Sequence, residues 1–418
     1  MAVASPQADR PGGSLGGRAI WTLADQAVSS LSNAGLSILV ARSVGIEGFG
    51  SFSVVLLVFS FAVGLSRTLV TDPLVIRFSG VASEVRRRAT ADATGAAAGL
   101  GLLGSAACGV AGLVLEGTLG AAMWSLAVVL PLILVQDTLR YAFFAGSRPA
   151  AATINDVVWT VLQFAAVGAL LLLGRDTVTL LVLAWGASAG VAALVGCFQA
   201  GVRPRPSGGP AWLRTHHDLA TKLAADYVLN TGAVNTALLL IGSILGIAAL
   251  GAVRAAQVLL GPLQLVISGV TAFMLPVVSR RVAASASVLR PSAVTALLLT
   301  SISFVWVLAL LLLPDAVGQE LLGETWASAR DVLPALSAMM LVLSVAVGAG
   351  LGLRSLGRSD LLLRTTLVQA PLIVVCTWLG AVTGGLSSSA AGLALAHVPG
   401  PVLLWLALRR AAPADQRA

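Results

Sequence analysis

Residues 20–52 read I-W-T-L-A-D-Q-A-V-S-S-L-S-N-A-G-L-S-I-L-V-A-R-S-V-G-I-E-G-F-G-S-F, and a second apolar run continues from there to Ser79. Two apolar segments thus flank the short turn V-G-I-E-G-F-G (44–50). Each is long enough to cross a bilayer as a helix, which takes about 20 residues. A weaker copy of the pattern begins near residue 225. The stretch predicts a membrane hairpin that occurs twice in the chain.

The composition is that of an integral membrane protein. Of the 418 residues, 57% are hydrophobic and only 11% are charged, whereas soluble domains are about one-quarter charged. So few charges cannot cover a water-soluble protein of this size, but lipid solvates the outside of a membrane protein. The net charge is +8. Its cations lie in short loops between apolar runs, so we expect no nucleic-acid partner.

Twelve apolar segments are predicted to span the membrane: 19–41, 50–76, 93–115, 121–145, 152–173, 178–200, 221–245, 251–278, 291–313, 331–353, 361–382 and 388–408. Of the 26 Lys and Arg residues, 21 lie in the two tails and in every second connection. Only three lie in the alternate connections. Because basic loops stay on the cytoplasmic side, this split predicts that both termini are cytoplasmic.

A shift of 201 positions overlays the two halves of the chain. It aligns Ala24-Asp25 with Ala225-Asp226, and V-G-I-E-G-F-G with L-G-I-A-A-L-G (245–251), giving six identities in 27 positions. Six helices is an even number, so the repeats are parallel. The Pro- and Gly-rich stretch between them, with His216, His217 and Asp218, is interpreted as a solvated loop. We predict a tail (1–18), an N-lobe (19–200), a cytoplasmic linker (201–220), a C-lobe (221–408) and a second tail (409–418).

Ionisable residues inside the N-lobe helices are candidate functional groups, because each costs roughly 2.5–3.5 kcal/mol on insertion scales. Asp25, Ser29, Asn33 and Ser37 follow one another at intervals of four and form one polar helix face. The face either lines water or forms hydrogen bonds between helices.

Arg67 and Asp72 lie in the second segment, where Pro73 is expected to kink or end the helix. An Arg67–carboxylate pair is predicted, either structural or functional. Gln163 is deep enough to line a cavity. Four further polar residues are interpreted as anchors at the cytoplasmic edge: Asp137, Arg140, Asn155 and Asp156.

The second half has fewer such residues. Asp226 repeats the position of Asp25, and Arg254 and Gln257 are three apart and therefore share a helix face. Arg254 has no acidic partner in its own hairpin. An unpaired intramembrane arginine is expected to meet an anion or a carboxylate from elsewhere in the protein, and phosphate is an anion that a guanidinium binds well. The alternative is a snorkelling or structural arginine.

Catalytic signatures are missing from the sequence. There is no Walker A motif, no H-E-x-x-H motif and no recognisable Ser-His-Asp arrangement. Cys108, Cys197 and Cys376 lie far apart in apolar runs, without metal spacing. The predicted outward connections are too short to build the active site of a membrane glycosyltransferase. We therefore predict a protein that is not an enzyme and has no cofactor.

Several motifs carry a resemblance to a known family: A-D-Q-A-V-S-S-L-S-N (24–33), A-R-S-V-G-I-E-G-F-G-S-F (41–52), T-D-P-L-V-I-R (71–77) and L-L-G-E-T-W-A-S-A-R-D-V-L-P-A-L (321–336). Together they resemble bacterial polysaccharide-biosynthesis membrane proteins, the Wzx-type flippases of the MOP superfamily, which are related to the MATE transporters. The resemblance implies an all-α membrane protein of about 12 helices, with two six-helix lobes around a partly cationic cavity.

The resemblance also implies a function. A polyprenyl-diphosphate-linked sugar unit would pass from the cytoplasmic to the outer leaflet of the bacterial cytoplasmic membrane, with a polysaccharide polymerase and glycosyltransferases as partners. Arg67 and Arg254 would bind the diphosphate or acidic sugars. Asp25, Asp72 and Asp226 would bind a coupling ion, Na⁺ or H⁺, or act as gates. The C-lobe departs from this pattern by having few charged residues within its helices, which leaves the coupling step open.

Two other functions fit the same sequence. A MATE-like exporter of small molecules, driven by H⁺ or Na⁺, would need a dominant acidic site, whereas the deep charges here include arginines. A non-transporting scaffold of a polysaccharide-assembly complex would have little use for costly charges within its helices.

Overall fold

The computed structural model describes residue 28 and the ranges 32–79, 81–283 and 287–412, and the statements below concern those residues. This part of the chain contains helices and connections but no β-strand. Ten of its helical segments are long and apolar enough to span a membrane. The elements are α2 (Gly45–Ser66), η1 (Arg67–Thr71), α3 (Asp72–Phe78), α4 (Ser83–Val114), α5 (Gly117–Ala145), α6 (Pro149–Leu172), α7 (Val178–Ala200), η2 (Pro206–Gly208), α8 (Gly209–Thr215), α9 (His217–Leu245), α10 (Ile247–Ala283), α11 (Leu289–Leu311), α12 (Asp315–Leu322), α13 (Thr325–Ser355), α14 (Ser359–His397) and α15 (Pro399–Ala411).

The ten observed spans correspond to eleven of the twelve predicted segments. The first segment lies mostly outside the described residues, and residues 32–43 are helical. The last two belong to one run of 52 residues, which at about 1.5 Å per residue is far longer than a ~30 Å hydrocarbon core. This run folds back at Gly384 and Gly385, where Gly385 has a φ of 70°. Gly380 consequently lies against the backbone of Ser388.

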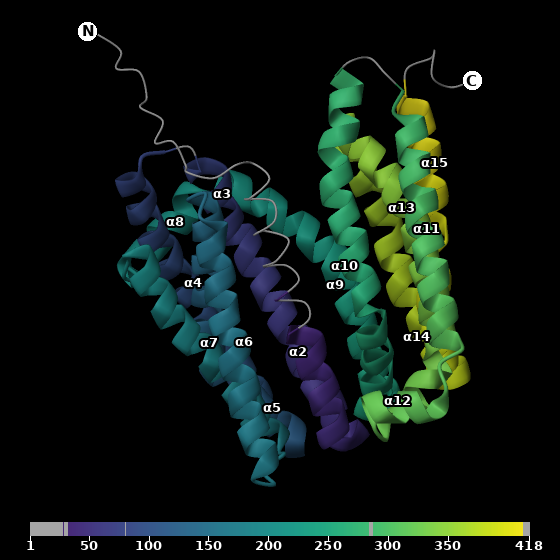
Figure 1. Cartoon of the computed structure of the whole chain (residues 1–418), viewed down its shortest axis with the longest axis horizontal. Coiled ribbons are helices and arrows are strands. Elements are labelled where there is room, and N and C mark those ends of the chain that lie inside the picture. Colours follow the sequence, from purple (N-terminus) through teal and green to yellow (C-terminus); the bar gives the residue numbers. More distant parts are fainter. Residues whose placement is uncertain (1–27, 29–31, 80, 284–286, 413–418) are drawn as a thin grey trace.

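The helices form two bundles, α2–α8 and α10–α15 (Figure 1). The bundles converge at the end that carries the first residues of α2 and α10, which we name the turn end. They are farther apart at the opposite end, where α15 finishes, which we name the terminal end. Helix α9 contacts both α2 and α14, so it bridges the two bundles.

Two glycines related by the 201-residue shift bring the bundles together at the turn end. Gly50 lies directly against the carbonyl oxygen of Ile247. A Cβ on Gly251 would lie 2.8 Å from the carbonyl oxygen of Ile46 and 3.0 Å from the nitrogen of Gly50. The contacts are reciprocal, because the same shift relates Ile46 to Ile247. Residues without a side chain let helix backbones approach this closely, so the sequence repeat corresponds to a structural repeat.

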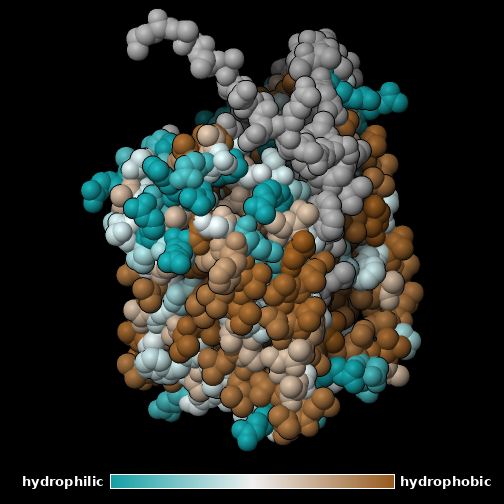
Figure 2. Space-filling model, turned by 60° about the vertical axis from the view of Figure 1, so that its left-hand side comes forward, coloured by the Kyte–Doolittle hydropathy of each residue, from teal (hydrophilic) through white to brown (hydrophobic). Residues whose placement is uncertain are grey.

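The outside of the molecule suits a bilayer. Figure 2 shows a belt of hydrophobic side chains around the middle, with hydrophilic groups gathered toward the two ends. Leu103 and Leu113 of α4 are 70% and 75% exposed, which is costly in water but not against lipid. The chain is therefore a multi-pass membrane protein.

The stretch 201–216 is docked on the first bundle. The Arg205 backbone N–H donates to the carbonyl oxygen of Ala91 at 2.9 Å, and the short helix α8 packs on α4. The segment is therefore packed in part, through the buried Val202, Gly209 and Trp212, while much of the rest of it is exposed. Its role as a linker between two domains, and the domain boundaries themselves, stay predictions.

His216 is only 6% exposed, because the rings of Trp212 and Phe78 pack against it. Its Nδ1 lies 2.8 Å from Nη1 of Arg77, and Nη2 of Arg77 lies 2.6 Å from the Asp218 carboxylate. The solvated interpretation is therefore wrong for His216, whereas His217 and Asp218 are exposed, as predicted; Arg77 joins His216 and Asp218 to the end of α3. In this way α3 is tied to the start of α9.

Candidate functional site

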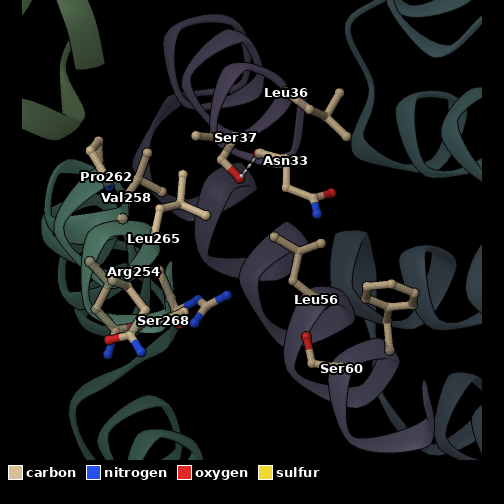
Figure 3. A pocket seen from close by; sticks show the side chains of 15 residues that line it. Asn33, Leu36, Ser37, Leu56, Ser60, Arg254, Val258, Pro262, Leu265 and Ser268 are labelled. Carbon is tan, nitrogen blue, oxygen red and sulfur yellow. Dashed lines mark hydrogen bonds between the residues drawn. The ribbon is translucent and has the colours of Figure 1, made fainter. Parts of the chain in front are cut away.

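A polar cavity of about 340 Å³ lies where residues 32–43, α2 and α10 face one another (Figure 3). Among the described residues that line it there is one guanidinium, several amides and hydroxyls, and no carboxylate. The polar lining residues are Asn33, Ser37, Ser60, Arg254, Gln257, Gln264 and Ser268. Amides and hydroxyls both donate and accept hydrogen bonds. The lining therefore suits a ligand that is rich in hydroxyls and negatively charged.

Arg254 supplies the only formal charge among the described lining residues of this cavity. Its Nη1 donates a hydrogen bond of 2.9 Å to Oε1 of Gln257, and its Nε has no hydrogen-bond partner among the described residues. A guanidinium left without a counter-charge in a low-dielectric site is costly. Arg254 thus lines the cavity with a neutral partner, Gln257, and without a carboxylate among the described lining residues.

A second cavity of about 330 Å³ continues the first toward the terminal end, and the two share Asn33, Phe59 and Ser60. Arg67 lines it and contacts Asp137 through two nitrogens, Nη2 at 2.6 Å and Nε at 3.0 Å. The guanidinium carbon of Arg67 lies 5.0 Å from the centre of the Tyr141 ring. This fork-to-carboxylate geometry compensates the charge of Arg67 within the protein.

A second buried pair completes the wall of this cavity. Nε of Arg140 lies 3.1 Å from Oδ2 of Asp156, and the two side chains are 9% and 5% exposed. Nε2 of Gln136 donates to Oδ1 of Asp156 and to Oδ1 of Asn155, both at 3.1 Å. The network joins α5 to α6. With both carboxylates matched by an arginine, the second cavity has no net charge from these groups.

The position of Arg67 follows from a local feature of the sequence. Pro73 has no N–H and its ring collides with the carbonyl four residues back. The helix widens there into the π-turn η1, in which the Asp72 N–H bonds to the carbonyl oxygen of Arg67. Such turns redirect side chains and are frequent at functional sites. The regular α-helix thus ends before Pro73, in the π-turn η1, and the chain continues as α3.

The structure brings several predicted residues together. Asn33, Arg254 and Gln257 line the first cavity, and Asn33 and Arg67 line the second. Gln163 is buried beside Asn33 and Asp156, with an Nε2 that has no partner among the described residues.

None of the three predicted acidic coupling residues is among the described residues that line the two cavities. Asp72 lines neither cavity. Asp25 lies outside the described residues, and the side chain of Asp226 is likewise not described. Their coupling or gating role stays a prediction.

The interpretation of Asp137, Arg140, Asn155 and Asp156 as edge anchors is wrong, because all four are buried. The signal that could have found them is distance from the helix ends. Asp137 lies eight residues before the end of α5 and Asp156 seven residues after the start of α6. At ~1.5 Å per residue this is about 10–12 Å, beyond the interfacial layer.

Comparison with known proteins supplies the family. Residues 39–331, more than half of the chain, match the polysaccharide biosynthesis protein family. The chain belongs to this family. No curated protein sequence matches it significantly.

Solved structures supply the fold. A multidrug resistance MATE family transporter of the MOP superfamily, inward-facing, has a TM-score of 0.69 at 13% identity and covers 94% of this chain and 97% of its own. The lipid II flippase MurJ, in an inward closed conformation, has a TM-score of 0.71 at 9% identity, covering 94% and 87%. A MOP superfamily transporter from Pyrococcus furiosus, described as having a binding pocket of reverse polarity, has a TM-score of 0.54 at 12% identity, covering 94% of each.

At these identities the likeness concerns the fold. The resemblance to the MOP superfamily is confirmed, and so is the prediction of an all-α membrane protein of the MATE/MOP type. The solved structures that share this fold are described as transporters and a flippase, and the family as one of polysaccharide biosynthesis. The placement of the termini in the cytoplasm stays a prediction.

Proposed function

We propose that this protein moves a polyprenyl-diphosphate-linked oligosaccharide across the bacterial cytoplasmic membrane by alternating access. Arg254 carries the proposal: among the described residues, it is a cation without a counter-charge in a cavity otherwise lined by amides, hydroxyls and apolar groups, with Gln257 as its one neutral partner. A diphosphate would supply the missing counter-charge through charge-assisted hydrogen bonds, and the sugar hydroxyls would bind the amides. The membership of a polysaccharide biosynthesis family supports this class of cargo.

The closed turn end supports a path that opens toward the terminal end in this conformation. Besides the glycine contacts, Arg42 pairs with Glu320 at 3.1 Å, and the Thr325 hydroxyl donates to the carbonyl oxygen of Ala41 at 3.2 Å. These contacts join the helix before α2 to α12 and α13. If basic loops mark the cytoplasmic side, the cavity here receives cargo from the cytoplasm.

The alternative, a MATE-like exporter of cations, needs a carboxylate that is free to bind its cargo. The carboxylates that line the two cavities among the described residues are Asp137 and Asp156. Each faces an arginine, at 2.6 Å and 3.1 Å. The electrostatics of the site therefore favour an anionic cargo.

The test is transport by the purified protein in proteoliposomes, with a fluorescent oligosaccharide on a polyprenyl diphosphate as cargo. Arg254→Ala is expected to lower kcat/KM about tenfold to a hundredfold, because a hydrogen bond to a charged group contributes about 1.5–3 kcal/mol. Arg254→Lys should keep part of the activity. Arg364→Ala, which makes the same charge change at an exposed position, should transport normally.

Two results would oppose the proposal. Wild-type vesicles that export a cationic dye under a H⁺ or Na⁺ gradient, and leave the lipid-linked glycan in place, would favour the MATE-like exporter. Vesicles that move neither cargo, from a protein that binds a glycosyltransferase or polymerase, would favour the scaffold.

A further inference from the structure

An apolar groove of about 550 Å³ lies on the other side of α2 from the polar cavities. Helix α2 contributes Leu57, Val58 and Phe61, α9 contributes Gly232 and Ala233 among others, and α14 contributes Pro371. Two of the described lining residues, Asn235 and Thr236, are polar. The groove lies at mid-helix in α2 and α9, hence within the hydrocarbon region. It draws its walls from both bundles, so its width depends on their relative position.

Adjacent residues connect this groove with the second polar cavity. Along α2, Ser60 lines the cavity and Phe61 the groove; along α9, Tyr227 lines the cavity and Val228 the groove. The wall between the two spaces is therefore formed by single side chains at this level.

One contact seals that wall. The Tyr227 hydroxyl donates a hydrogen bond of 3.0 Å to the carbonyl oxygen of Ser60, and its ring centre lies 5.9 Å from that of Phe61. Gly64 lies directly against the Tyr227 ring, so this packing needs a residue without a Cβ. Tyr227 therefore connects α9 to α2, and this contact breaks if α9 moves away from α2.

We propose that the groove holds the polyprenyl chain of the cargo while the diphosphate-sugar head occupies the polar cavity, with the linkage passing between Tyr227 and Gly64. This rests on the proposed function. An amphiphilic cargo needs a charged and an apolar compartment side by side, since transferring each CH₂ of its chain out of an apolar environment costs about 0.8 kcal/mol. The small residues Gly232 and Ala233 leave room for the methyl branches of such a chain. The occupant is thus the cargo's own chain, and a bulk phospholipid chain is the competing outcome.

Ala233→Trp fills the groove, and Leu103→Trp is the matched control at a lipid-facing position of α4. Two probes carry the same fluorescent sugar diphosphate, one on a long polyprenyl chain and one on a geranyl chain. Ala233→Trp is expected to raise KM for the long-chain probe about tenfold or more and to leave the geranyl probe nearly unchanged. Leu103→Trp should change neither. An unchanged KM for the long-chain probe in Ala233→Trp would overturn the proposal.

The outcomes separate this proposal from the proposed function. If wild-type protein moves neither probe, the flippase function itself fails. If Ala233→Trp does not fold, wild-type protein is photolabelled with a diazirine polyprenyl diphosphate and the sites are mapped. Labels confined to α2, α9 and α14 that excess polyprenyl diphosphate displaces support the groove. Labels spread over the lipid-facing surface, or displaced equally by phosphatidylglycerol, would place bulk lipid there instead.

Discussion

Arg67 and Arg254 lie on corresponding segments of the two repeats, η1 after α2 and helix α10, yet the protein surrounds them differently. Arg67 forms a two-nitrogen contact with Asp137. Arg254 has one neutral partner, Gln257, and a free Nε among the described residues. The first arginine is compensated inside the protein, and the second is available to something that enters the cavity.

The two arginines also occupy different positions within the repeat. Shifting Arg67 by 201 positions gives Ser268, and shifting Arg254 back gives Ser53, whose hydroxyl donates to the carbonyl oxygen of Phe49 at 2.6 Å. Each arginine thus has a serine as its counterpart. The two lie 14 positions apart on the repeat, or about 20 Å along a helix axis. The backbone is close to symmetric at the turn end, while the charges along the two cavities are not.

The largest expected effect comes from breaking a compensated pair. Asp156→Asn should lower the free energy of unfolding by about 3–5 kcal/mol, because it leaves the buried Arg140 without its counter-charge. Denaturant titration in mild detergent measures this. The double variant Arg140→Met/Asp156→Leu should be close to wild type, because an apolar pair of similar volume replaces the network. If the single and the double variant were equally unstable, the instability of Asp156→Asn would not come from an uncompensated Arg140.

Replacing Arg254, the arginine without a counter-charge among the described residues, is expected to change the free energy of unfolding in the opposite direction. Arg254→Met should leave the free energy of unfolding unchanged or raise it by about 1–3 kcal/mol, because removing a charge that has no counter-charge among the described residues outweighs the loss of its one hydrogen bond to Gln257. Its transport should fall at the same time. A stability gain combined with lost activity is typical of a functional group. A destabilised variant with normal transport would instead make Arg254 structural.

The sequence was sufficient for the fold because its signals are local. Runs of apolar residues, alternating basic loops and the G-I-x-x-x-G copies require no knowledge of contacts between distant helices. The partner of Arg67 could not be predicted in this way. Asp137 lies 70 positions away, and only the packing of α5 against α2 brings it to Arg67. The groove lined by α2, α9 and α14 was missed for the same reason, since its walls come from segments more than 300 positions apart in sequence.

The reciprocal glycines offer a test of the symmetry itself. Gly50→Ala places a methyl group against the Ile247 carbonyl, so the turn end should open at a cost of about 1–3 kcal/mol. Gly251→Ala should have a similar effect, because it meets Ile46 in the related contact. Distances between spin labels at the turn ends of α2 and α10 would report the opening. Gly168→Ala, where the added Cβ has open space, is the control. Clearly unequal shifts for the two related variants would show that the contact is not symmetric in function.

The smallest effect concerns the junction that ties α9 to the first bundle. Burial, with the positive charge of Arg77 beside it, lowers the pKa of His216 below its ordinary value near 6.5. The unfolded chain therefore binds more protons than the folded one as the pH falls through 6.5. The stability that neutral His216 contributes is present above that pH and is lost below it.

Asp218 does not disturb this window, because the ordinary pKa of an aspartate, about 3.9, lies well below pH 5.5, and its carboxylate accepts a hydrogen bond from Nη2 of Arg77 at 2.6 Å. Thermal midpoints of wild type should drop between pH 7.5 and pH 5.5 by more than those of His216→Gln. The other titrating groups, His217 and His397 included, are common to both proteins and cancel in the difference. Parallel pH profiles would mean that protonation of His216 costs this junction nothing. The tie between α3 and α9 would then rest on Arg77 and Asp218 alone.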